Sequence, residues 1–231
     1  MAKHGKKYKE ALAKIESDKK FSLTEGLTKV KELAHAKFDE SVDAHVNIGI
    51  DPSKGEQAVR GSVLLPHGTG KQVRIVVFAK GDFAEQARKA GADFVGTEDL
   101  IEKISGGWLD FDFAVATPDV MGMVGKLAKL LGPKGLLPNK KVGTVTFDVA
   151  DIVQDLKKGR VFFKNDKNAI VHFSFGRKSF DVKHLQENIS AFLKALATSK
   201  PSTSKGRFIR KVTITATMGP SIPVNLDEIK L

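Results

Sequence analysis

The residues best suited to binding chemistry lie on a predicted strand near the C-terminus, RFIRKVTITATM at residues 207–218. Because side chains alternate across a strand, one face carries a cation followed by hydroxyl groups: Lys211, Thr213, Thr215 and Thr217. Such a row can form hydrogen bonds with phosphate oxygens and with 2′-hydroxyl groups. Threonine also favours strands for packing reasons alone, and for any single one of these residues that structural explanation is the more economical one.

A second predicted strand, AIVHFSF at residues 169–175, has a similar polar face. His172 and Ser174 lie on that face, and the apolar residues between them point inward. The preceding turn NDKN adds Asp166 and Lys167. The two strands together predict a polar, cationic sheet face.

Positive charge is concentrated in the same part of the chain. The net charge is +11, and residues 160–231 carry 13 Lys or Arg against 5 Asp or Glu, whereas residues 1–67 and 68–159 are nearly balanced. This distribution predicts an acidic partner, and a polar sheet face suits RNA, which is recognised by shape, sugar contacts and stacking. Nonspecific binding to duplex DNA is the alternative, and it predicts salt-sensitive binding without preference for any sequence or RNA fold.

Motifs for catalysis, cofactors and metals are missing from the sequence. There is no cysteine, and no two of the six histidines lie three or four residues apart. HGTGKQ at residues 67–72 lacks the first glycine and the final Ser or Thr of a phosphate-binding loop, so it is better explained as a hinge turn. We therefore expect no enzyme, no cofactor and no metal. The rival hypothesis, a small-molecule-binding protein or enzyme, requires saturable binding of ATP or NAD.

Membrane and secretion signals are also missing. No apolar run approaches the roughly 20 residues that a helix needs to cross a bilayer. The N-terminus, MAKHGKKYKE, leads into no apolar signal core. We expect a cytoplasmic protein with no membrane partner.

Periodicity predicts the elements that must position the polar face. A basic helix lies within residues 1–20, and Ser22 with Glu25 forms a capping box for a helix over 22–36. Residues 41–50 alternate as a strand with one wet face. A last helix spans residues 182–198.

The middle of the chain has a different pattern. Between residues 71 and 158, nearly continuous apolar strands alternate with helices, which predicts a parallel sheet covered by helices. Within it, a helix is predicted around VMGMVGKLAKLLG, residues 120–132. Residues 126–141 carry five Lys and no acid, in a Gly/Pro-rich loop after a helix. This basic loop is either plainly solvated or a contact for a different RNA or protein.

The two ends of the chain predict one discontinuous domain, because neither has enough strands for a core of its own. We predict an α/β protein with two domains. Residues 1–67 and 160–231 form an α+β RNA-binding domain, and residues 68–159 form an inserted Rossmann-like parallel α/β domain. The two chain crossings at its border form a hinge.

Several segments in order resemble one known family: KFDESVDAHVNIGIDP, VRGSVLLPHGTGK, ATPDVMGMVGKLAKLLGPKGLLPNKKVGTV, GRVFFKNDKNAIVHFSFG and TATMGPSIPVN. The sequence resembles the bacterial first protein of the large-subunit ribosomal series, which forms the mobile stalk beside the tRNA exit site. The resemblance implies a structural protein of the large subunit that binds the stalk of 23S rRNA and assists movement and release of exit-site tRNA. It also implies a monomer when free, which represses translation of its own operon by binding the mRNA.

The resemblance and the strand pattern together predict ten RNA-binding residues: Lys37, Phe38, Lys164, Asp166, Lys167, His172, Thr215, Thr217, Met218 and Gly219. For Phe38, contact with RNA and cover of the core stay open as equal alternatives. Gly219 and Pro220 suit a tight turn that lets the backbone approach RNA. Arg177 and Lys178 are expected to contribute charge only.

Overall fold

The computed structural model describes residues 5–15, 19–204 and 206–225. The chain divides into two compact units. The first unit consists of Met1–Gly70 and Val161–Leu231, and the second is Lys71–Arg160. The mixed α/β class predicted from the sequence is confirmed.

The first unit contains α1 (Lys6–Ala13), α2 (Leu23–Leu33), β1 (Ser41–Ile48), the short 3-10 helix η1 (Gly55–Gln57), β2 (Arg60–Leu64), β6 (Arg160–Lys164), β7 (Ile170–Arg177), α8 (Val182–Thr198), β8 (Ile209–Ala216) and β9 (Ile222–Val224). The second contains β3 (Ile75–Phe78), α3 (Asp82–Lys89), β4 (Phe94–Gly96), α4 (Glu98–Ser105), β5 (Phe113–Ala116), α5 (Met121–Val124), α6 (Ala128–Lys134) and α7 (Val149–Lys158), with 3-10 helices η2 (Pro118–Val120), η3 (Gly125–Leu127) and η4 (Lys140–Val142).

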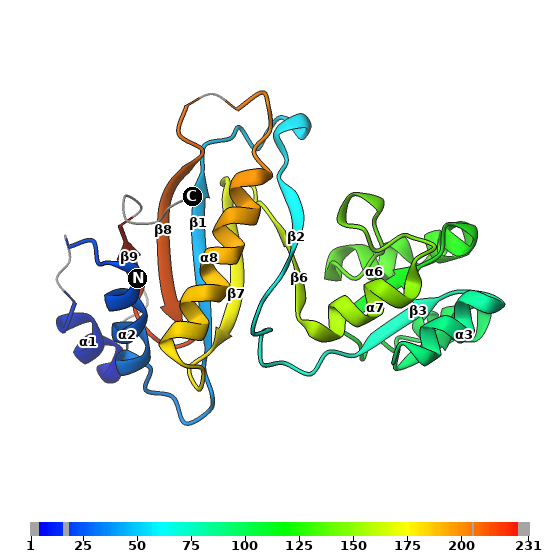
Figure 1. Cartoon of the computed structure of the whole chain (residues 1–231), viewed down its shortest axis with the longest axis horizontal. Helices are drawn as coiled ribbons and strands as arrows, with labels where there is room; N and C mark the ends of the chain where they lie inside the picture. The colour runs from blue at the N-terminus through cyan, green and yellow to red at the C-terminus, as the bar shows by residue number, and fades with distance from the viewer. Residues whose placement is uncertain (1–4, 16–18, 205, 226–231) are drawn as a thin grey trace. The chain divides into compact units, whose positions relative to one another are not determined.

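The first unit is built on a four-stranded antiparallel sheet with the order β7-β1-β8-β9. Alternate residues of β1 are fully buried on one face: Val42, Ala44, Val46 and Ile48. Helices α2 and α8 cover that face (Figure 1), and α8 packs Phe192 against Phe173 of β7 with the ring centroids 3.9 Å apart. Since both helices lie on the same side, the opposite face of the sheet is left to its polar side chains.

Both covering helices begin where the sequence predicts, α2 after its cap Ser22 and α8 at Val182. Ser22 Oγ accepts a hydrogen bond from the Glu25 backbone N–H at 3.3 Å, and Glu25 Oε2 accepts one from the Ser22 N–H at 3.3 Å. The capping box is therefore confirmed. Helix α2 stops at Leu33, earlier than predicted, because Ala34 has an extended backbone that turns the chain toward β1. Of the predicted N-terminal helix, α1 is described, and residues 1–4 and 16–18 lie outside the described residues.

The second unit has the predicted parallel sheet, in the order β4-β3-β5. Every residue of β3 is buried, as expected for a strand covered on both faces. The helix predicted around residues 120–132 is confirmed as α5, η3 and α6. The prediction that residues 126–141 form a loop is therefore wrong for residues 126–134. Helix α6 continues through Pro133 and ends at Lys134, and Gly135, with a φ of 72°, caps it in the left-handed conformation.

Strands β6 and β7 follow one another in the chain but do not form an extended hairpin. β6 pairs with β2 in a separate two-stranded sheet, and only Asn165 and Val171 form a bridge between the two strand regions. The turn between them contains Ala169, a non-glycine residue with a φ of 59°. This turn redirects the chain from the small sheet to the edge of the large one.

Among the described residues, no helix combines the length and apolar character that crossing a membrane requires.

Candidate nucleic-acid interface

The open face of the large sheet carries polar side chains from three neighbouring strands: Ser41, Asp43, His45 and Asn47 of β1, His172 and Ser174 of β7, and Lys211, Thr213 and Thr215 of β8. The antiparallel register places them in rows. His45 lies between His172 and Thr213, and Asn47 lies opposite Lys211. We call this surface the polar face.

Three loops meet at one end of the polar face: residues 34–40, 177–181 and 216–221. Glu40 is fully buried among them. Its Oε1 accepts a hydrogen bond from the Ala36 N–H at 2.6 Å, and its Oε2 accepts one from the Met218 N–H at 3.0 Å. One side chain therefore fixes two loops that lie far apart in the sequence. We call this region the three-loop end.

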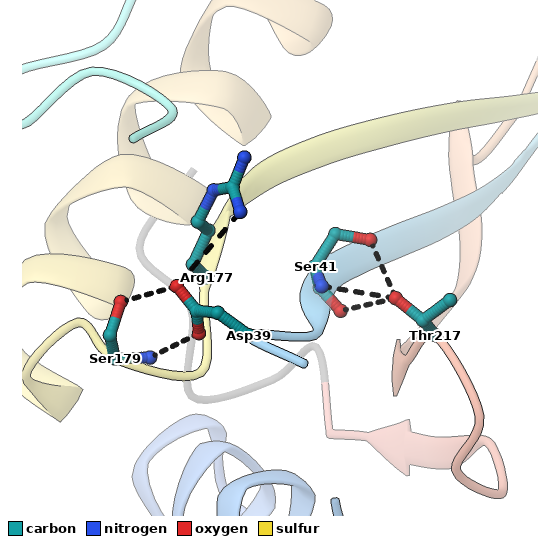
Figure 2. A network of polar contacts seen from close by, with 5 residues as sticks. All are labelled: Asp39, Ser41, Arg177, Ser179 and Thr217. Carbon is teal, nitrogen blue, oxygen red and sulfur yellow. Dashed lines mark hydrogen bonds and ion pairs between the residues drawn. The ribbon is translucent and has the colours of Figure 1, made fainter. Parts of the chain in front are cut away.

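A polar network binds the same loops together at the surface (Figure 2). The Asp39 carboxylate accepts hydrogen bonds from the Ser179 N–H at 3.0 Å and the Ser179 hydroxyl at 2.8 Å, with Arg177 at 4.0 Å. Ser41 and Thr217 exchange backbone and hydroxyl hydrogen bonds, including Ser41 N–H to Thr217 Oγ1 at 3.0 Å. Arg177 and Thr217 thus have structural partners within the protein.

This braced end displays apolar side chains to solvent. Phe38 is 55% exposed and Met218 is 53% exposed. Phe38 lies two residues before Glu40, and the backbone N–H of Met218 donates to the Glu40 carboxylate. Exposed aromatic and thioether side chains on a rigid base suit contacts with bases and sugars. The exposure favours the ligand-contact interpretation of Phe38 over the alternative that it covers the core.

Two further predicted residues form the turn beside Met218. The Thr215 hydroxyl lies within donating distance of the backbone carbonyl oxygens of Ala216, at 3.0 Å, and Gly219, at 3.2 Å, so its one hydrogen stabilises the turn. Gly219 does not have a positive φ, and a Cβ placed on it would lie an ordinary 3.4 Å from the Ala216 Cβ. The packing of the protein itself therefore does not require glycine at 219.

Another predicted group lies in the turn between β6 and β7. Asp166 Oδ1 accepts hydrogen bonds from the Asn168 N–H at 2.8 Å and the Ile170 N–H at 2.7 Å. These bonds, first the one from Ile170, lower the pKa of Asp166. Lys164 and Lys167 are exposed on the same turn. Asp166 thus holds the turn in shape, and the two lysines supply its outward charge.

The predicted residues therefore occupy two ends of one strip. Lys37, Phe38, Thr215, Thr217, Met218 and Gly219 lie at the three-loop end, and Lys164, Asp166 and Lys167 lie near the far end, with His172 between them. The eight residues of β1 separate the ends by about 23 Å, given a rise of about 3.3 Å per residue. An elongated polar ligand fits such a strip better than a small molecule.

Two histidines, His45 and His172, stand at the middle of the polar face. Their Nδ1 atoms are 2.9 Å apart, so one ring donates and the other accepts. The ring of His172 also has its Nε2 3.6 Å from Asp166 Oδ2. Burial, followed by the nearby His172, lowers the pKa of His45, and Asp43 partly opposes this shift. Protonation of His45 is therefore disfavoured in the folded protein.

We expect NMR titration of the free protein to give His45 a pKa below its ordinary value of about 6.5. In His172→Gln, the pKa of His45 should rise but stay below that value, because burial is the larger cause. Since the unfolded chain binds the proton more tightly, this contribution to stability is complete above about pH 6.5 and is lost as the pH falls through the folded pKa. A His45 pKa unaffected by His172→Gln would contradict the coupling.

Comparison with known proteins places this basic, two-unit α/β chain among ribosomal proteins. The model of the ribosomal protein L1p/L10e family matches residues 30–220. Large ribosomal subunit protein uL1 of Thermus thermophilus is 52% identical over 226 residues, which cover 97% of this chain and 99% of that protein. The protein of the same name from a second strain of this organism gives the same values.

The chain belongs to the ribosomal protein L1p/L10e family. These matches confirm the family resemblance that the sequence motifs indicate. This family consists of ribosomal structural proteins, so the expectation that the chain is not an enzyme is confirmed as well.

The sequence prediction missed Glu40 and the network around Asp39. Glu40 follows KFD and looks like one more surface acid, because its partners Ala36 and Met218 come together only in the folded chain. The alternation of β1 offers one usable clue. Glu40 directly precedes that strand, where the chain leaves the loop that carries Lys37 and Phe38.

Proposed function

We propose that the protein is a constituent of the large ribosomal subunit, acting in the cytoplasm, that binds the mobile stalk of 23S rRNA through its polar face. The ten predicted residues would be its RNA contacts. Among them, Thr215, Thr217 and Asp166 would also hold the contact loops in shape. The proposal is supported most by one observation. A braced three-loop end displays Phe38 and Met218 beside a polar sheet face to which the basic third of the chain contributes β7 and β8.

The chemistry of the polar face favours RNA over duplex DNA. Its side chains are mainly hydroxyl, imidazole and amide groups on a sheet, which suit 2′-hydroxyl and phosphate contacts across a shallow groove. Its apolar side chains gather at one end, where unstacked bases can pack on them. A helix presented for insertion into a major groove is not part of this face.

We further propose the partners that the family resemblance implies. The protein would bind the mRNA of its own operon and repress its translation, because a similar RNA structure would fit the same face. It would also assist the movement and release of deacylated exit-site tRNA, and it would be a monomer when free. The five lysines of residues 126–141 in the second unit stay open to a second RNA or protein contact.

The two units are proposed to be the two predicted domains, joined by a hinge. Buried Asn188 of α8 supports a hinge that follows Gly68. Its Oδ1 accepts from the His67 N–H at 3.1 Å, and its Nδ2 donates to the Gly68 carbonyl at 2.9 Å and the Phe175 carbonyl at 2.8 Å. These bonds hold the chain to the first unit as far as Gly68.

Chemical footprinting of the protein on total rRNA tests the main proposal. We expect protection limited to one hairpin region of the large-subunit rRNA, because a fixed strip of contacts selects one folded shape. Equal protection of many rRNA regions, or of DNA, would indicate nonspecific binding. Equilibrium dialysis against ATP and NAD provides the control, and saturable binding of either would favour the small-molecule hypothesis.

A further inference from the structure

A β-bulge interrupts β8 at the far end of the polar face. Asn47 of β1 lies opposite Lys211, but the next residue, Ile48, lies opposite Ile209. Arg210 is therefore an extra residue in β8. A bulge bends its strand and changes the direction of the side chains beside it. Arg210 and Lys211 are both exposed, although strict alternation would send one of them to the buried face.

Gly49 shows where the Arg210 side chain lies. Gly49 directly follows β1, which ends at Ile48, and it is buried like Ile48. A Cβ at Gly49 would lie 3.1 Å from Arg210 Nε and only 2.5 Å from the Arg207 carbonyl oxygen. The missing side chain thus leaves the space that the Arg210 side chain occupies. The exposed Arg210 side chain therefore passes beside the end of β1.

The turn with Lys164 and Lys167 is held beside this bulge. The Ile48 N–H donates to the Ala169 carbonyl at 2.9 Å, and the Gly49 N–H donates to the Phe208 carbonyl at 2.6 Å. Consecutive residues at the end of β1 therefore bind the turn on one side and the start of β8 on the other. Lys164, Lys167, Arg210 and Lys211 border this end of the strip.

These cations are available to a ligand. In the part of the chain that the structure describes, no acidic side chain forms an ion pair with Lys164, Lys167, Arg210 or Lys211. The nearby acids have other partners. Asp166 accepts hydrogen bonds within its own turn, and Asp51 lies 3.6 Å from Lys54. The far end therefore presents positive charge without internal neutralisation.

We propose that Arg210 and Lys211, directed outward by the bulge, form a phosphate-binding clamp together with Lys164 and Lys167. The clamp grips the backbone of the RNA whose bases and sugars contact the three-loop end, and so it rests on the proposed function. One pair of cations, Arg210 and Lys211, lies on β8, and the other, Lys164 and Lys167, lies at the turn after β6. The three lysines would bind phosphates as point charges, and the planar Arg210 guanidinium would add a fork of hydrogen-bond donors. Recognition of one RNA fold would then depend on the spacing of two contact regions along β1.

The test is the salt dependence of binding to the rRNA fragment that the footprint protects. Arg210→Gln and Lys211→Gln are each expected to make the slope of log K against log salt shallower by about 1, and the double variant by about 2. Arg210→Lys should restore most of the slope, because it keeps the charge. Lys194→Gln is the matched control, since Lys194 is exposed on α8, which covers the opposite face of the sheet.

The outcomes separate the clamp from the proposed function. A wild-type protein that protects one rRNA region, together with a double variant of unchanged slope, overturns the clamp alone. A slope that falls equally in Lys194→Gln also overturns it, because general charge would then be the cause. A wild-type protein that protects no rRNA region overturns both proposals. Circular dichroism of each variant verifies that the sheet is intact.

Discussion

Replacing Phe38 and Met218 together with Ala is expected to weaken binding to the protected rRNA fragment by about 100-fold. Each lost stacking or apolar contact with RNA costs roughly 1–3 kcal/mol, and about 1.4 kcal/mol is a factor of ten. Because the two side chains are 55% and 53% exposed, the free energy of unfolding should change by less than about 0.5 kcal/mol for each substitution. Fluorescence anisotropy measures the affinity, and urea denaturation measures the stability.

Leu64→Ala is the control for this double variant. Leu64 is 45% exposed on β2, which belongs to the small two-stranded sheet and to none of the three loops, so its substitution should change neither quantity. Thr217→Ala is expected to lower the free energy of unfolding as well as the affinity, because it also removes the hydroxyl that accepts a hydrogen bond from the Ser41 N–H. An unchanged affinity of the Phe38 and Met218 double variant would refute the site assignment.

Glu40→Ala is expected to lower the free energy of unfolding of the first unit by about 3 kcal/mol. The substitution leaves the Ala36 and Met218 N–H groups without their acceptor. Both hydrogen bonds are part-buried, so each loss should cost about 1.5 kcal/mol, in the lower part of the range of roughly 1–3 kcal/mol for a buried unsatisfied group. The loops of residues 34–40 and 216–221 would also lose their common anchor. Affinity for the rRNA fragment should therefore fall as well, although Glu40 itself is buried and touches no ligand.

Amide hydrogen exchange gives the most direct measurement for Glu40→Ala. The Ala36 and Met218 amides should exchange faster, and Glu40→Gln should have an intermediate effect because it keeps one acceptor oxygen. Glu32→Gln, at an exposed position of α2, is the matched neutral control. Trp108 belongs to the second unit, so its fluorescence transition should not move. Unchanged exchange at both amides would show that Glu40 does not brace the loops.

Local patterns predicted the elements that have local causes. The capping box of Ser22 and Glu25 marks the start of α2, and α8 spans residues 182–198 as predicted, before Pro201. The alternation in β1 reflects its one buried face. Each of these features depends on residues within one or two turns or along one strand, so the sequence contains the needed information.

Features that depend on distant partners could not be predicted. The bulge at Arg210 is a shift of register between β8 and β1, and no residue type marks it. The separation of β6 from β7 depends on pairing with β2, about 100 residues earlier by sequence number. Asp166 was predicted as an RNA contact from its place in the turn, while its hydrogen bonds to Asn168 and Ile170 became visible only in the folded turn.

The strand order β7-β1-β8-β9 also constrains the sequence of events during synthesis. β1 is made early, yet both of its neighbours come from the last third of the chain. A growing chain therefore exposes an unpaired, half-apolar β1 while the whole second unit, whose strands are contiguous, is completed and free to fold. The polar face exists only after β8 has left the exit tunnel. An incomplete nascent chain cannot compete with the finished protein for a ligand of that face.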